Sequence, residues 1–316
     1  MTLNQEIPAA ELDNLTFVPN SNFFGATNRV IPQPVGVVGV IVPWNFPLNL
    51  SLVPLTAIFA AGNRAMVKMS ENSRHLARLL IERLPAYFPP EKLQVFDETG
   101  GVGVEFSKLP FDHLLFTGSG ATGRLVMSAA AQNLCPVTLE LGGRSPAIVC
   151  SDFPVRTAAE RVLFVKYLNA GQICTTVDHL WLPHDKIDAF VQAAREIVPA
   201  RYPRLDSPDY TSIIDQRSFD RLLAALDDAR ERGATLLPLL PGPAFDAATL
   251  SAEAAEQGVV RGVSTWTRAR PPASLIEEKM SNSLKRGQPY TTRPKTIVPN
   301  DGAVLPAIGS TSRWYI

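Results

Sequence analysis

Residues 35–47 read Val-Gly-Val-Val-Gly-Val-Ile-Val-Pro-Trp-Asn-Phe-Pro, and they carry the first signal of the fold. The first part is β-branched and apolar apart from its glycines, which is typical of a strand buried in a parallel sheet. Pro43 and Pro47 then enclose a rigid turn, because each fixes its own φ and lacks a backbone N–H. Asn45 lies inside this turn, either as a donor that polarises a carbonyl oxygen or as a partner for its own backbone.

Strands and helices alternate on the carboxyl side of this stretch. The predicted strands are 35–42, 65–69, 93–96, 113–116, 137–141 and 147–150. The predicted helices are 50–61, 73–84, 122–132, 155–168, 185–197 and 218–232, and 238–243 is predicted to be a loop. Such alternation favours an α/β fold with a mostly parallel sheet, whose ligands gather at the carboxyl ends of the strands.

Length and composition exclude several classes of protein. The 316 residues predict two domains or one large α/β unit, and 46% hydrophobic against 19% charged residues excludes disorder of the whole chain. A net charge of zero, with no recognisable module, argues against nucleic-acid binding. The three cysteines cannot all pair with one another, which indicates a reducing compartment, and the four histidines lack metal-ligand spacing, so we predict no metal.

The amino-terminal residues 1–28 show no targeting signal, so a cytoplasmic protein is predicted. Residues 30–63 contain no charge and have the hydropathy of a membrane helix. Their prolines and the amides of Asn45 and Asn49 would need hydrogen-bond partners in lipid, so we predict no membrane span.

Two residues are candidates for covalent and acid–base chemistry. Cys174 follows Asn-Ala-Gly-Gln-Ile at 169–173, a glycine-containing turn after a predicted helix. Its thiol is either a nucleophile or a small buried apolar group. Glu140 interrupts the apolar strand of 137–141 and precedes two glycines; it either reaches solvent at the sheet end or, if buried, serves as a general base.

Two further stretches have features of nucleotide sites. Residues 116–123, Phe-Thr-Gly-Ser-Gly-Ala-Thr-Gly, form a bend from a strand into a helix, where glycines allow a phosphate to approach backbone donors. A bend of this kind is also common without a ligand. Lys68 and Glu71, at the end of another predicted strand, either hold a ribose or form an exposed ion pair.

Five pieces taken together, in this order, resemble the aldehyde dehydrogenase superfamily. They are the Pro-Trp-Asn-Phe-Pro turn, the Lys-x-x-Glu step, the Gly-Ser-x-x-x-Gly bend, the Leu-Glu-Leu-Gly-Gly strand and the Gly-Gln-x-Cys loop. The separation of Glu140 and Cys174, 174 − 140 = 34, is also similar to that of the family. The resemblance covers about 30–245, and the wording of 109–119 and 207–215 resembles most the coniferyl-aldehyde dehydrogenase branch.

The resemblance implies an enzyme that oxidises an apolar or aromatic aldehyde to a carboxylic acid. Cys174 would attack the aldehyde carbon, Asn45 and the Cys174 backbone N–H would hold the oxyanion, and Glu140 would activate water to hydrolyse the thioester. The cofactor is NAD or NADP, a choice that the sequence leaves open. The residues expected to bind it are Pro43, Trp44, Lys68, Ser70, Glu71, Gly118, Ser119, Gly123, Leu141 and Gly142.

The chain also departs from the family pattern. The Glu-x-Phe-Gly-Pro motif, whose glutamate grips the nicotinamide ribose, and the terminal strand used for homo-oligomer association are not found, and Arg144 stands where lysine is usual. We therefore expect a truncated or frame-shifted product with exposed strand edges. The expected parts are an unmatched segment 1–28, a Rossmann-like cofactor domain 29–142 without its amino-terminal helical part, an incomplete α/β catalytic domain 143–245, and a non-homologous, poorly structured tail 246–316. An inactive remnant and a cofactor-independent thiol esterase are the alternatives.

Overall fold

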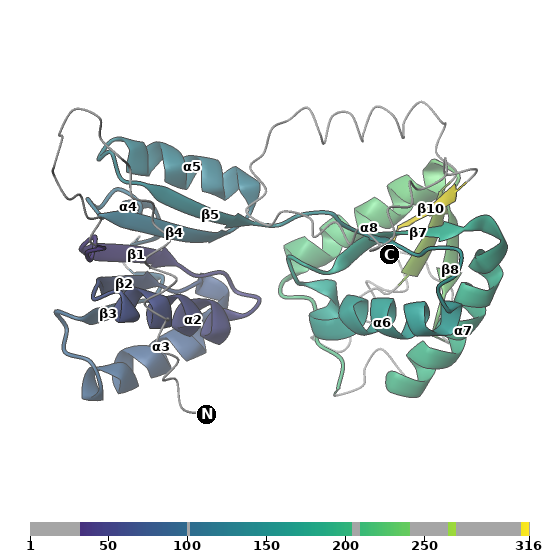
Figure 1. The fold of residues 1–316 in the computed structure, drawn as a ribbon, viewed down its shortest axis with the longest axis horizontal. Coiled ribbons are helices and arrows are strands. Elements are labelled where there is room, and N and C mark those ends of the chain that lie inside the picture. The colour runs from purple at the N-terminus through teal and green to yellow at the C-terminus, as the bar shows by residue number, and fades with distance from the viewer. Residues whose placement is uncertain (1–31, 100–101, 204–208, 241–264, 270–310, 316) are drawn as a thin grey trace, which may run out of the picture. The chain divides into compact units, whose positions relative to one another are not determined.

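The computed structural model describes residues 32–99, 102–203, 209–240, 265–269 and 311–315. The chain divides into two compact units between Glu140 and Leu141. The boundary predicted from the sequence lies two residues later, after Gly142. Each unit has its own five-stranded sheet (Figure 1).

The first unit is built on a sheet with the order β3-β2-β1-β4-β5. Its strands are β1 (Val37–Ile41), β2 (Arg64–Lys68), β3 (Leu93–Phe96), β4 (His113–Gly118) and β5 (Val137–Leu141). β1 pairs in parallel with both β2 and β4, and β2 pairs in parallel with β3. The chain leaves β1 first toward β2 and later returns to its other side with β4, so the topological switch point of the sheet lies between β1 and β4.

The helices of the first unit cover both faces of this sheet, with α5 on one side and α2 and α3 on the other (Figure 1). The helical segments are α2 (Pro47–Ala60), η1 (Glu71–Ser73), α3 (Arg74–Arg83), η2 (Leu84–Ala86), α4 (Val102–Phe106) and α5 (Gly120–Ala131). The core beneath α2 and α3 contains Val38 and Val40 of β1 and Val67 of β2, packed against Leu55 and Leu80. Alternate residues of each strand thus supply one face of the core, as the pleat requires.

The second unit has a mixed sheet with the order β6-β7-β10-β9-β8. Its strands are β6 (Ser145–Ile148), β7 (Val177–Pro183), β8 (Thr235–Pro238), β9 (Thr265–Ala269) and β10 (Thr311–Tyr315), and its helical segments are α6 (Val155–Tyr167), η4 (Leu168–Gly171), η5 (His184–Lys186), α7 (Ile187–Arg201) and α8 (Gln216–Glu231). β6 and β7 are parallel, whereas β10 and β9 join by antiparallel pairing. Leu163 of α6, Leu180 of β7 and Phe190 of α7 are buried together in its core.

Within the tail that we expected to be poorly structured, residues 265–269 and 311–315 form strands of this sheet. They read Thr-Trp-Thr-Arg-Ala and Thr-Ser-Arg-Trp-Tyr, rich in the β-branched and aromatic residues that favour strands. β10 pairs with β7 on one side and with β9 on the other. β7 therefore has a neighbour on each side, and the sheet edge that we expected to be exposed is covered there.

No helix within the described residues is long and apolar enough to span a membrane. The charge-free stretch 30–63 instead supplies β1 and α2, with a turn between them. Pro47 begins α2, a position that tolerates a residue without a backbone N–H.

Candidate functional site

The carboxyl edge of the first sheet gathers most of the predicted site residues. The Pro43–Pro47 turn follows β1, Lys68 ends β2, and Ser119 follows β4. His113 Nε2, at the start of β4, lies 2.9 Å from Thr138 Oγ1, near the start of β5. The two strands therefore begin at the same edge of the sheet, and both end at the opposite edge, where Glu140 lies. The residues meet at this edge because parallel strands end on the same side.

Asn45 lies in the turn between β1 and α2 and is half-buried. Its Oδ1 accepts the N–H of Phe46 at 3.1 Å, so the side chain bonds to its own backbone, which was one of the two predicted roles. An amide that accepts through its oxygen has its donor hydrogens on Nδ2, so this bond is compatible with the other role as well.

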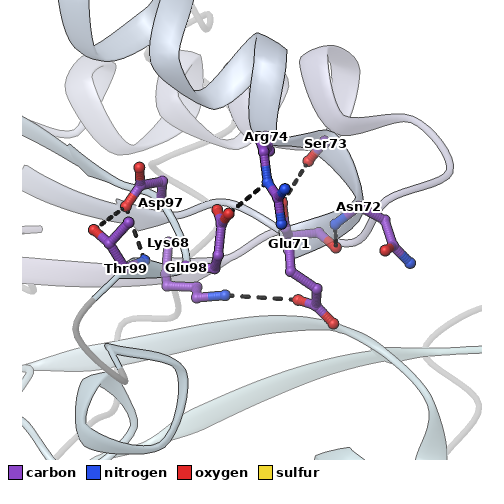
Figure 2. A network of polar contacts seen from close by, with 9 residues as sticks. Lys68, Glu71, Asn72, Ser73, Arg74, Asp97, Glu98 and Thr99 are labelled. Carbon is purple, nitrogen blue, oxygen red and sulfur yellow. Dashed lines mark hydrogen bonds and ion pairs between the residues drawn. The ribbon is translucent and has the colours of Figure 1, made fainter.

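Lys68 and Glu71 form the pair expected from the sequence. Lys68 is buried, with 7% of its surface exposed, and its Nζ lies 3.9 Å from Glu71 Oε2 (Figure 2). Glu71 remains 65% exposed at its side chain. Ser70 between them is buried, and its Oγ accepts the N–H of Asn72 at 3.3 Å, which caps η1. A buried ammonium group beside an accessible carboxylate differs from the exposed ion pair that was the alternative.

Glu98, which follows β3, belongs to the same edge and was not predicted as a site residue. Its Oε1 accepts Arg74 Nε at 2.7 Å, whereas its Oε2 is buried and has no hydrogen-bond partner among the described residues (Figure 2). The Glu98 backbone N–H, and after it the Arg74 guanidinium, lowers the pKa of this carboxyl group. The available signal was the polar Asp-Glu-Thr run directly after a strand at 97–99.

The glycine bend connects β4 to α5 as predicted. Ser119 is the N-cap of α5, and its Oγ accepts the N–H of Thr122 at 3.1 Å. A side chain at Gly120 would meet nothing within 4 Å, so the start of the helix is open to a ligand. At Gly118 a Cβ would lie 2.6 Å from the Phe116 ring, which explains glycine there by packing. Gly123 is buried and donates its N–H to the Ser119 carbonyl at 2.8 Å.

Glu140 is exposed on β5. One of its two predicted roles, that of a general base, depended on burial, and this burial is not found. Leu141 is half-buried, and Gly142 is exposed with no atom within 4 Å of an added Cβ. These residues occupy the end of β5 and the residue after it, as the sequence predicted.

Cys174 belongs to the second unit, in a turn between η4 and β7. The turn is closed by a hydrogen bond from the Thr176 N–H to the Ile173 carbonyl at 3.2 Å. The thiol is free and exposed, which excludes the alternative of a small buried apolar group. Cys150 is also exposed and free, whereas Cys135 is buried, and this burial raises the pKa of its thiol.

The candidate chemistry is thus distributed between the two units. Asn45, Glu140 and the predicted cofactor residues up to Gly123 belong to the first unit, whereas Leu141, Gly142 and Cys174 belong to the second. Within the described ranges, no group of histidine, cysteine and carboxylate side chains has an arrangement that could hold a metal ion.

A protein-family model matches most of the chain. The model described as the aldehyde dehydrogenase family matches residues 6–247, from within the segment 1–28 to close to the predicted start of the tail.

Individual relatives extend this match. The chain is 53% identical over 233 residues to the probable coniferyl aldehyde dehydrogenase of Pseudomonas aeruginosa, covering 73% of this chain and 48% of the relative. It is 51% identical over 220 residues to the coniferyl aldehyde dehydrogenase of a Pseudomonas species, and the match covers 69% of this chain and 46% of that relative. The chain therefore spans about half the length of these curated relatives.

A solved structure shows the same fold over a similar share. The Mycobacterium tuberculosis aldehyde dehydrogenase complexed with NAD+ superposes with a TM-score of 0.59 at 31% identity, covering 65% of this chain and 44% of that one.

Proposed function

Because this chain belongs to the aldehyde dehydrogenase family, we propose that it oxidises an apolar or aromatic aldehyde to a carboxylic acid with NAD or NADP. The observation that carries the proposal is the free, exposed thiol of Cys174, at the position of the family's Gly-Gln-x-Cys loop. The similarity to two coniferyl aldehyde dehydrogenases supports an aromatic substrate.

The residues of the first unit fit a nicotinamide dinucleotide. The open amino terminus of α5 at Ser119 and Gly120 supplies backbone donors and a positive dipole for a pyrophosphate. Lys68 and Glu71 supply a cation and a carboxylate for the adenosine ribose. We propose that the other contacts come from Pro43, Trp44, Ser70, Gly118 and Gly123 of this unit, and from Leu141 and Gly142 at the start of the second unit. When bound, the nicotinamide ring accepts the hydride that the substrate carbon gives up.

Three side chains would carry the rest of the chemistry. The Cys174 thiolate adds to the aldehyde carbon, so that a C–S bond forms and the carbonyl oxygen takes the negative charge. The Asn45 amide and the Cys174 backbone N–H stabilise this charge by donating hydrogen bonds. Once the substrate carbon has given up its hydride, Glu140 takes a proton from the water that attacks the carbonyl carbon of the thioester, and the C–S bond breaks to release the acid and the thiolate. The role of Glu140 rests on its place in the family's Leu-Glu-Leu-Gly-Gly strand rather than on burial, and its exposure leaves the carboxylate accessible to water.

The test is formation of reduced nicotinamide, followed by its absorbance, with freshly reduced protein and a panel of aliphatic and aromatic aldehydes. We expect Cys174→Ala to lower turnover by at least about a thousandfold, because it removes the nucleophile. Cys150→Ala removes the other exposed thiol and should leave turnover unchanged.

Equal turnover by Cys174→Ala and the unmodified chain would overturn the proposal. Ester hydrolysis that needs Cys174 but no cofactor, without aldehyde oxidation, would replace it by a thiol esterase. No reaction and no thermal shift with either cofactor would replace it by an inactive remnant.

A further inference from the structure

The backbone at 169–171, shortly before Cys174, is strained. Asn169 and Ala170 have φ of 51° and 52°, and Gly171 follows with φ of 75°. Left-handed conformations are unfavourable for residues with a side chain, and a run of them persists only where surrounding contacts hold it. The strained turn at 169–171, which leads to Cys174, therefore needs an external restraint.

Gln172 supplies contacts of the kind required. Its Nε2 donates to the Asn169 carbonyl at 3.0 Å and to the Ser212 carbonyl at 3.0 Å, and its Oε1 accepts the Ile214 N–H at 2.9 Å. Asn169 Nδ2 in turn donates to the Gln172 carbonyl at 3.3 Å. The side-chain amide thus holds the strained turn together and ties it to a segment about forty residues away in sequence.

The segment at 210–214 is itself anchored in the second unit. The Tyr210 ring packs against Tyr167 and Tyr202, with centroids 6.0 Å and 5.0 Å away. Ile213 is buried with Phe219 of α8, and Ala170 packs against the same cluster. Gln172 therefore connects the turn to a packed part of the structure rather than to a loose loop.

We propose that Gln172 is a positioning residue for Cys174: it clamps the strained 169–171 turn onto the 212–214 segment, which fixes the Cys174 thiol and backbone N–H for reaction. This deepens the proposed function and rests on it for the role of the thiol. The requirement is geometric, since a displacement of about 1 Å can cost a catalyst about a hundredfold in rate.

The first measurement is steady-state kinetics of Gln172→Ala, which removes all the side-chain bonds of the clamp. We expect kcat to fall by at least tenfold, while KM for the cofactor stays unchanged because the proposed nucleotide contacts of Lys68 and Ser119 lie in the first unit. Gln192→Ala is the matched control: its amide bonds only to Glu196 among the described residues, on an exposed face of α7, and kcat should not change.

The second measurement is amide hydrogen exchange of the whole chain without aldehyde or cofactor, so that it does not depend on turnover. In Gln172→Ala, exchange should accelerate at least about tenfold at the amides of Gln172 and Ile214 and stay unchanged in α7. Gln172→Glu has the same size and still accepts the Ile214 N–H, but loses the donors. It should release the turn and leave the Ile214 amide protected, and it decides the question if the alanine variant does not fold.

Unchanged exchange at the Gln172 amide in both variants would overturn the inference. Accelerated exchange with unchanged kcat would also overturn it, because the clamp would then stabilise the turn without positioning the thiol. If the unmodified chain forms no reduced nicotinamide, the proposed function fails, and the exchange experiment alone decides whether the clamp exists.

Discussion

The charges around Lys68 bear on which ribose the proposed cofactor site would accept. Glu98 holds the Arg74 guanidinium at 2.7 Å, and its second oxygen lies buried at the same sheet edge as Glu71. In this state the Arg74 guanidinium is paired with the Glu98 carboxylate, and Lys68 is paired with Glu71 in the same group of side chains (Figure 2). We therefore expect the proposed cofactor site to favour an uncharged ribose 2′-hydroxyl over a 2′-phosphate.

Glu98→Gln should therefore shift cofactor preference toward NADP. Removing the carboxylate releases Arg74 for a phosphate and lowers repulsion, so we expect the ratio of kcat/KM for NADP to that for NAD to rise about fivefold to tenfold. Steady-state kinetics with both cofactors measures it. Glu82→Gln, which removes an exposed partner of Arg83, is the control. A ratio that stays constant or falls in Glu98→Gln contradicts the prediction.

Cys135 should make the stability of the first unit fall at alkaline pH. Burial raises the pKa of its thiol above the unfolded value. Its contribution to stability is therefore complete below the unfolded pKa of about 8.5 and is lost as pH rises through the folded value. Under reducing conditions, the Tm of the unmodified chain should fall more steeply above about pH 8.5 than that of Cys135→Ser. Parallel pH profiles of the two proteins would show that another group controls the fall.

At the scale of elements, helix α5 ends in a Schellman motif that has leucine where glycine is usual. The Cys135 N–H bonds to the Ala130 carbonyl and the Leu134 N–H to the Ala131 carbonyl, both at 3.1 Å, which is the Schellman pattern. Leu134 therefore occupies the left-handed position with φ of 54°, and its side chain is 90% exposed. Glycine is the residue that this position favours.

Leu134→Gly should raise the free energy of unfolding by about 0.5–1 kcal/mol, since it relieves the left-handed strain without loss of buried surface. Denaturant unfolding with a fixed slope measures the change. The same replacement at Leu125, which is 73% exposed inside α5, should lower stability by about 1 kcal/mol. If both variants lose stability, the backbone conformation at Leu134 is not the controlling factor.

At the scale of the whole molecule, the two units have separate cores and separate proposed tasks. One core is formed by strands β1–β3 with α2 and α3, the other by α6, α7 and β7. A cofactor held by the first unit should stabilise that unit directly, because a ligand shifts stability only where it binds the folded form.

NAD at about a hundred times its Kd should therefore raise the unfolding free energy of the first unit by about 2.7 kcal/mol. Hydrogen exchange resolved by peptide assigns the effect: β1 and β4 should gain protection, and α7 should not. Lys68→Ala should lose most of this gain at the same NAD concentration. Equal protection in both units, or none in either, would contradict the assignment of the cofactor to the first unit.

Signals within a short window predicted most of the elements. β3 and β5 have the predicted bounds, and α6 ends one residue before its predicted end, because apolar spacing and helix caps act over a few residues. β7 was not predicted, since Asp178 and His179 interrupt the apolar pattern, which becomes regular only at Leu180 and Leu182. The strands β9 and β10 were missed because their pairing partners lie far away in the sequence.

The sequence by itself determined the family, the α/β class and the positions of Cys174, Lys68 and the glycine bend, because these depend on motifs and on local periodicity. Only the tertiary structure decided that Lys68 is buried, that Glu98 holds Arg74, and that Gln172 ties the thiol turn to 212–214. These contacts join residues far apart in the chain, and their existence depends on which strands and turns fold against one another rather than on the residues next to them.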